Sequence, residues 1–114
     1  MRQRRMGMDF AMVFRYLFNF SKDGDMIYIS HLDLLRLLSR AARRADLPVA
    51  LSLGFSPHFK IKLKRALKLG VVSDNEEGEM ILKNRLSEDE FKERLQGQLP
   101  QGIHIKEVRW EGVE

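Results

Sequence analysis

The chain has 114 residues, of which 44% are hydrophobic, and a formal net charge of +4, which together indicate one compact domain with a real core. Because it contains no cysteine, a disulfide framework, a thiolate metal site and an iron–sulfur cluster held by this chain are excluded. No uncharged apolar run approaches the ~20 residues needed to span a bilayer, so we expect no membrane contact and a cytoplasmic location.

The first half of the chain predicts a strand followed by a helix. We expect a flexible extension over residues 1–11 and a single α+β domain over residues 12–114. The aromatic run at 12–20 is typical of a strand, the polar SKDGD at 21–25 predicts a turn, and MIYI at 26–29 a return to the sheet. Ser30 and Asp33 resemble a capping box that opens a helix over about 31–45.

The second half predicts a hairpin, a further strand, a helix and a last strand. PVALSLG at 48–54 indicates a strand, FSPH turns the chain, and residues 59–64 alternate in the manner of a half-buried strand. A connection over 65–78 ends in the acidic SDNEEG. A strand at 79–84, a helix over about 88–97 and a strand at 103–110 complete the domain.

This order favours a ferredoxin-like βαββαβ sandwich, with both helices on one face of a mainly antiparallel sheet and room for one extra short strand. A right-handed crossover would make the strand before the first helix parallel to the strand after it. Since SHLD follows the first of these strands and GFSPH follows the second, we expect His31 and His58 to be neighbours.

Charge is strongly segregated along the sequence. Residues 36–68 contain nine Lys or Arg and one acid, Asp46, whereas residues 69–114 contain six bases and eleven acids. A solvated helix face accounts for some of this, but a helix and a strand that are both basic on one side indicate a surface that attracts polyanions. The expected phosphate contacts are Arg36, Arg40, Arg43, Arg44, Lys60, Lys62, Lys64 and Arg65.

The histidines also suggest metal binding or catalysis as alternatives to polyanion binding. His31, Asp33 and His58 would in principle supply two imidazoles and a carboxylate to a metal, but no ligand pair has helical spacing, and we expect neither metal nor cofactor. The catalytic candidates are His31 and His58, as bases in a metal-independent RNA cleavage. No phosphate-binding glycine loop and no nucleophile elbow are present.

Nucleic-acid binding has more support, because lysines that alternate along a strand can follow a phosphate backbone. Phe55, beside the turn, offers a stacking face for an unpaired base, whereas Phe59 shares a face with Ile61 and Leu63 and is expected in the core. The expected polar edge consists of Ser30, His31, Asp33, Gly54, Phe55, Ser56, Pro57 and His58.

The phrases FSKDGD, SHLDL, RRADLP and GFSPHFKI, followed by LKLGVVSDNEEGEMIL, resemble the radical SAM-linked protein family, a bacterial domain of unknown function. The resemblance covers about residues 14–110. It implies an accessory domain, fused to or encoded beside a B12-type radical SAM enzyme, in an RNA or ribosomal context. Phe59 and Ala66 stand where the family has prolines, and Lys62 and Lys64 replace small polar residues, which puts any role of a proline-rich loop in doubt.

Three functions therefore remain open. The first is a basic accessory domain that binds RNA or a ribonucleoprotein in association with a radical SAM enzyme. The second is a protein–protein adaptor that docks such an enzyme without touching RNA. The third is a metal-independent endoribonuclease that uses His31 and His58, suggested by fold analogy with the endoribonucleases of CRISPR systems.

Overall fold

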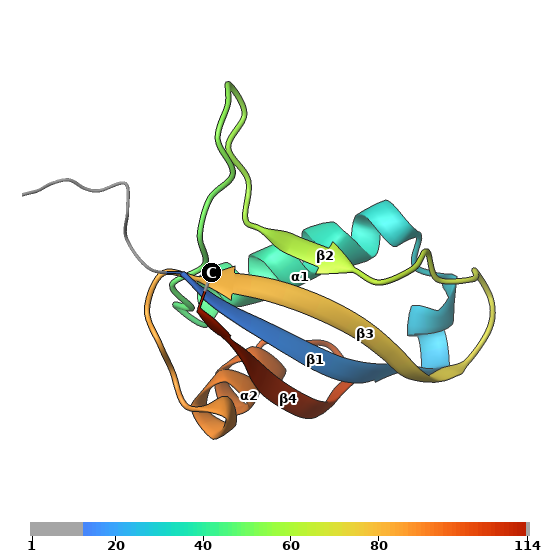
Figure 1. Ribbon diagram of the computed structural model, residues 1–114. Helices are drawn as coiled ribbons and strands as arrows, with labels where there is room; N and C mark the ends of the chain where they lie inside the picture. The colour runs from blue at the N-terminus through green and yellow to red at the C-terminus, as the bar shows by residue number, and fades with distance from the viewer. Residues whose placement is uncertain (1–12, 114) are drawn as a thin grey trace, which may run out of the picture.

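The computed structural model describes residues 13–113, and the expected extension at 1–11 lies outside them. Two helices and a short 3₁₀ helix are combined with four strands (Figure 1). In chain order the elements are β1 (Phe14–Lys22), η1 (Gly24–Tyr28), α1 (His31–Arg44), β2 (Ile61–Leu63), β3 (Ser73–Leu82), α2 (Glu88–Gln96) and β4 (Ile103–Val113).

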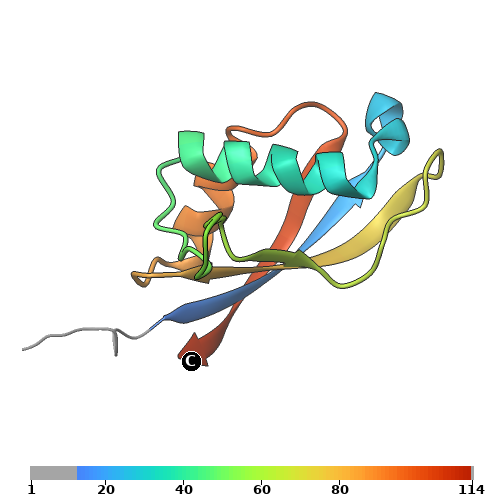
Figure 2. The same ribbon diagram turned by 90° about the horizontal axis from the view of Figure 1, so that it is seen from above.

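The four strands form one sheet in the order β2-β3-β1-β4, and each neighbouring pair is antiparallel. Both helices lie on the same face of this sheet, and the other face is open (Figure 2). This arrangement confirms the predicted ferredoxin-like βαββαβ fold. Beyond the four strands, isolated bridges join Val49 to Leu82 and Leu51 to Phe59, in the place of the extra short strand.

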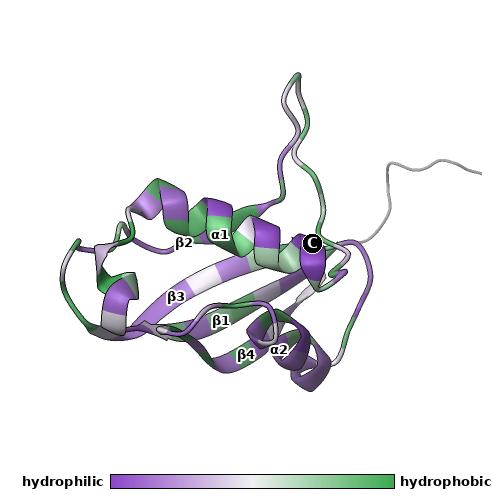
Figure 3. Cartoon of the chain, turned by 180° about the vertical axis from the view of Figure 1, so that it is seen from behind, coloured by the Kyte–Doolittle hydropathy of each residue, from purple (hydrophilic) through white to green (hydrophobic). Residues whose placement is uncertain are grey.

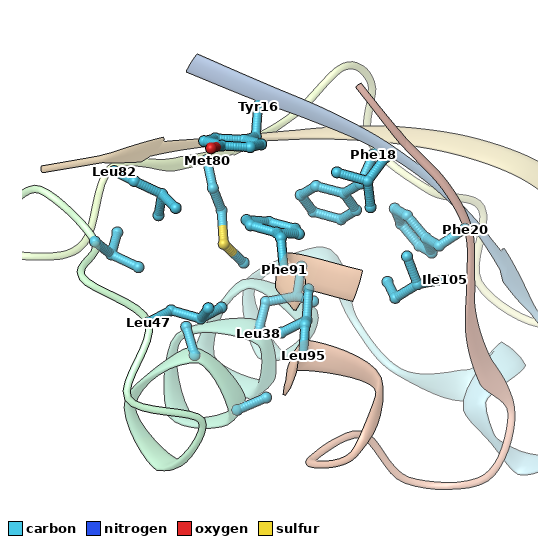
Figure 4. Packing of buried hydrophobic residues seen from close by; sticks show 14 of the residues in the cluster. Tyr16, Phe18, Phe20, Leu38, Leu47, Met80, Leu82, Phe91, Leu95 and Ile105 are labelled. Atoms are coloured by element: carbon cyan, nitrogen blue, oxygen red, sulfur yellow. The ribbon is translucent and has the colours of Figure 1, made fainter. Parts of the chain in front are cut away.

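The core lies between the sheet and the helices (Figure 4). Tyr16, Phe18 and Phe20 of β1 are fully buried, and the Tyr16 ring stacks on Phe91 of α2 with ring centres 5.1 Å apart. The Tyr16 hydroxyl donates a hydrogen bond to the carbonyl of Leu86 and accepts one from its N–H. A buried hydroxyl is thereby satisfied, and the entry to α2 is tied to the sheet.

The two helices begin where the sequence predicts. Ser30 Oγ accepts a hydrogen bond from the N–H of Asp33 (3.1 Å), and Ser87 Oγ accepts one from Glu90 (3.0 Å). These caps satisfy N–H groups that have no partner within the helix. In α1 the apolar side faces the core and the polar side faces outward (Figure 3). The buried side chains of α1 are Leu34, Leu38, Ala41 and Ala42.

Two expected boundaries are wrong. Residues 26–29 do not return to the sheet but belong largely to η1, where the buried Lys22 donates a hydrogen bond to the carbonyl of Ile27 (3.4 Å). The acidic SDNEEG is the first part of β3 and not a loop. Gly78 belongs in that strand because a Cβ there would lie 2.4 Å from the Phe18 ring, so only glycine lets the ring pack over the strand. Pairing with β1 overrides the low strand propensity of these residues.

A third correction concerns His31 and His58. The first strand after α1 is Ile61–Leu63, and residues 48–54 form only isolated bridges. The chain leaves α1 and reaches Leu82 through the Val49 bridge, at the sheet end where β1 begins. His31 is the first residue of α1, at the other end of that 14-residue helix, so the two histidines lie at opposite ends of the domain. The strand that runs parallel to β1 is β2, and His58 precedes this strand instead of following it.

Candidate nucleic-acid interface

The segment 50–59 is a hairpin that projects from the β2 edge of the domain (Figure 1). Its arms are joined by hydrogen bonds from Lys60 N–H to the Ala50 carbonyl (2.9 Å) and from Ser52 N–H to the His58 carbonyl (2.8 Å). Ser52 Oγ also accepts a hydrogen bond from the His58 N–H (3.1 Å) and lies 3.1 Å from its Nδ1. His58 and Ser52 therefore close the hairpin just below its tip.

The tip of the hairpin is apolar and fully exposed. Leu53 retains 97% and Phe55 108% of their reference exposure, and Leu51 retains 50%. Gly54 has φ of +119°, a backbone conformation that other residues rarely adopt, so it allows the chain to reverse there. Within residues 13–113, no other large hydrophobic side chain is as exposed as Leu53 or Phe55.

The root of the hairpin joins the sheet to the basic side of α1. Phe59, Ile61 and Leu63 pack against the core, as their alternation predicts. The guanidinium of Arg43 lies 5.1 Å from the centre of the Phe59 ring, a distance typical of a cation–π contact. Lys60 and Lys62 are exposed on the other side of the same strand. Cations from the helix and from the strand therefore lie on the two sides of the β2 edge at the hairpin root.

The remaining arginines of α1 lie on its exposed side. Arg36 pairs with Asp33 one turn earlier (3.2 Å), an exposed pair of little energetic weight. Arg40 and Arg44 line a hollow of about 400 Å³ between α1 and the turn that follows α2. No hydrogen bond or ion pair engages the side chain of either arginine among residues 13–113. Both are thus available to an external anion.

The open face of the sheet is less basic than the sequence suggests. Lys62 lies directly across from Glu79, and the N–H of Lys64 bonds to the carbonyl of Glu77. Glu79 also pairs with Arg15 at 2.9 Å. The acidic residues of β3 therefore neutralise much of the charge that the lysines bring to this face. The positive surface is strongest at the β2 edge and on α1.

Arg65 forms an ion pair with the buried Glu76. Its guanidinium donates two hydrogen bonds to the Glu76 carboxylate (3.0 and 2.9 Å), and the Ser73 hydroxyl donates a third. Burial by itself raises the pKa of Glu76, but the hydrogen bonds and the charges of Arg65 and Lys22 together outweigh it and lower this pKa below its usual 4.5. The same carboxylate raises the pKa of Arg65, first through the hydrogen bond and then through its charge.

The expected polar edge is divided between the two ends of the domain. Ser30, His31 and Asp33 open α1, whereas Gly54, Phe55, Ser56, Pro57 and His58 belong to the hairpin. His31 Nδ1 is buried without a hydrogen-bond partner among the described residues. Residues 13–113 hold no group of three or more His, Cys, Asp or Glu side chains suited to a metal ion. A cleavage that needs both imidazoles at one phosphate does not fit this arrangement.

Comparison with known sequences places the chain in a family. Residues 15–111 match DUF2344, described as an uncharacterized protein conserved in bacteria. The chain belongs to this family. No curated protein and no solved structure matches the chain. The DUF2344 match covers the sheet, both helices and the hairpin, and it names no activity. In residues 13–113 no helix has the length and apolar character to cross a membrane.

The main feature that sequence reasoning missed in this DUF2344 domain is the buried pair of Lys22 and Glu76. Lys22 is 1% exposed, and its Nζ donates a hydrogen bond to the carbonyl of Lys68 (2.7 Å). No local sequence pattern distinguishes a buried lysine at the end of an aromatic strand from a lysine that is exposed to solvent. Its burial depends on the 65–72 connection folding over it, which is a tertiary event.

Proposed function

We propose that this DUF2344 domain is an RNA-binding accessory module. The observation that carries the proposal is a group of exposed cations, on α1 and at the β2 edge, whose side chains have no ion pair or hydrogen bond within residues 13–113. An unpaired cation attracts phosphate without first losing a partner inside the protein. These residues, called the basic surface below, are Arg40, Arg44, Lys60, Lys62 and Lys64.

The distribution of acids supports the same proposal. No Asp or Glu occurs between Leu47 and Ser73, a segment that includes the whole hairpin and β2. A phosphate backbone that runs from α1 to the hairpin root would therefore meet no acid from this segment, and the nearest acids on the sheet are those of β3, such as Glu79 across from Lys62. Arg36 and Arg43 extend the contact on the helix side. Arg65 is a weaker contributor, because Glu76 already holds its guanidinium.

The resemblance to the radical SAM-linked family supplies the context that we propose. It suggests that the domain works in the cytoplasm beside a radical SAM enzyme, and that it delivers or holds RNA or a ribonucleoprotein for that enzyme. The chain itself would contribute the binding surface, and the enzyme would contribute the chemistry.

The basic surface can be tested by charge removal. Arg40→Gln with Arg44→Gln, and separately Lys60→Gln with Lys62→Gln, should each weaken RNA binding and lower the slope of log affinity against log salt. Each lost phosphate contact lowers that slope by about 0.7 to 0.9. Lys92→Gln with Lys106→Gln is the matched control, because it also removes two charges, on α2 and on β4, and β4 is at the opposite edge of the sheet from β2. Fluorescence anisotropy between about 50 and 200 mM salt measures both quantities.

Two outcomes would contradict the proposal. Wild-type protein whose affinity for RNA is independent of salt would lack the electrostatic contact altogether. Equal losses in the Lys92→Gln, Lys106→Gln control and in the two double variants of the basic surface would show a general effect of net charge, and not a localised surface.

A second candidate, a protein adaptor, is favoured by an apolar cluster at the other end of the domain. Tyr28 of η1 is 68% exposed, and Leu69, Val71 and Val72 of the connection between β2 and β3 are 49–63% exposed. The segments lie side by side, since the Gly70 N–H donates to the Ile27 carbonyl (2.6 Å). Exposed apolar clusters commonly mark protein contacts.

This candidate predicts that Tyr28→Ser with Leu69→Ser abolishes capture of a radical SAM enzyme from nuclease-treated bacterial extract. The double variants of the basic surface should retain capture. Capture that disappears on nuclease treatment would show that RNA bridges the two proteins, which contradicts a direct adaptor role.

A further inference from the structure

The hairpin tip, defined as Leu53–Pro57, has exposed apolar side chains that the fold does not use. Leu53 and Phe55 pack against nothing, yet the tip projects beyond the rest of the β2 edge (Figure 1). A solvent-exposed phenylalanine at the end of a hairpin gains nothing from the core. The core therefore supplies no packing role for this side chain.

The tip is held in place before any ligand arrives. The backbone bond between Ser52 and His58 closes the arms, and the His58 Nδ1 lies 3.3 Å from the Ser56 carbonyl. Pro57 restricts the backbone further, since its ring fixes φ. A hairpin closed in this way loses less conformational entropy on binding than an open loop would.

The charges around the tip favour a polyanion over an uncharged partner. Every ionisable side chain between Leu47 and Ser73 is basic or is His58. Arg43 and Lys60 lie at the root of the hairpin, so cations stand between its apolar tip and the body of the domain. A ligand that fits both parts has a charged backbone and flat apolar faces at a short distance from it.

We propose that the hairpin tip binds unpaired bases of RNA, with Phe55 stacked on a base and Leu53 packed beside it, while cations at the root hold the adjoining phosphates. This inference rests on the proposed RNA-binding function and specifies its substrate class as RNA with an exposed loop or bulge. Paired A-form RNA hides its base faces, whereas loops and bulges present them to aromatic side chains. Leucine and phenylalanine are also among the apolar residues that wedge between bases.

The test compares two RNAs that have the same number of phosphates. One is a stem–loop with 2-aminopurine in its unpaired loop, and the other is a fully paired duplex. The wild-type protein should bind the stem–loop more tightly and change the 2-aminopurine fluorescence. Phe55→Ala should weaken stem–loop binding about 10-fold, since stacking on an aromatic ring contributes roughly 1–3 kcal/mol per base. It should leave duplex binding and its salt dependence unchanged, and Phe55→Trp should restore the preference.

Leu32→Ala is the matched control, because Leu32 is an exposed apolar residue near the start of α1, outside the hairpin, and its loss should leave both affinities unchanged. Equal effects of Phe55→Ala on the two RNAs, or no effect on either, would overturn the inference while the salt-dependent duplex binding still supports the proposed function. Failure of the wild-type protein to bind either RNA would remove both. Phe55-dependent binding to phosphatidylglycerol vesicles, without a preference for the stem–loop, would identify the tip as a membrane anchor and overturn the inference.

Discussion

At the scale of single residues, the least expected feature is a buried lysine that fastens two connections to the sheet. Lys22 ends β1, and its Nζ donates to the Lys68 carbonyl and to the Ile27 carbonyl. Its charge also stabilises the ionised carboxylate of Glu76. Because Glu76 is 5% exposed, this carboxylate depends on its partners and not on water. The network thus joins η1, the 65–72 connection and β3.

Glu76→Gln should destabilise the protein, because a neutral amide cannot accept the Arg65 fork and the Ser73 hydroxyl as a carboxylate does. We expect a loss of about 1–3 kcal/mol in the free energy of unfolding, measured by urea denaturation at neutral pH. The exposure of Arg65 limits the contribution of the ion pair itself. Glu93→Gln, an exposed position on α2, is the control and should change stability little.

The same group predicts a dependence on pH. The pKa of Glu76 is lower in the folded protein than its usual 4.5, so its contribution to stability is present above that value. The contribution is lost as the pH falls below about 4.5 and the carboxyl becomes protonated. The wild-type and Glu76→Gln proteins should therefore converge in stability as the pH is lowered. A difference that stays constant through the acidic range would show that the charge of Glu76 contributes nothing.

At the scale of elements, local signals predicted most of the fold. The serines at 30 and 87 located both helix starts, and the alternation at 59–64 separated the inward Phe59, Ile61 and Leu63 from the outward lysines. Each of these features depends on residues that are close together in the chain, so it can be recognised from the sequence alone. The start of β3 was harder to predict from the sequence, because a glycine such as Gly78 is typical of a turn. Its place in the strand is explained only by the packing of Phe18 over it.

The candidate interface was predicted only in part, for a similar reason. Composition identified the basic residues and Phe55, but it did not show that the segment at 48–54 leaves the sheet and enters a projecting hairpin. It also did not show that Glu79 lies across from Lys62, or that Glu76 holds Arg65. Cross-strand partners depend on register, which a single sequence determines only weakly where the strands are short. The separation of His31 from His58 was also not predicted, because it depends on which segment after α1 joins the sheet.

At the scale of the whole molecule, the domain consists of a packed body and one projection with little share in the core. The core side chains come from β1, β3, β4, both helices and residues 47–49, and none comes from residues 51–58. The hairpin tip is attached to the body only through the paired arms. Stability and ligand preference should therefore be separable in this protein.

Replacing Leu53–Pro57 with Asn-Gly tests this separation. Ser52 and His58 would then flank a two-residue turn, and the Ser52 N–H already bonds to the His58 carbonyl, as such a hairpin requires. Since the deleted side chains are exposed and contact no core residue, we expect the free energy of unfolding to change by less than about 1 kcal/mol. Salt-dependent binding to duplex RNA should persist through the basic surface, and the preference for unpaired RNA should disappear. Global unfolding of the shortened protein would show instead that the tip is needed by the fold, so that its exposure has a structural cause.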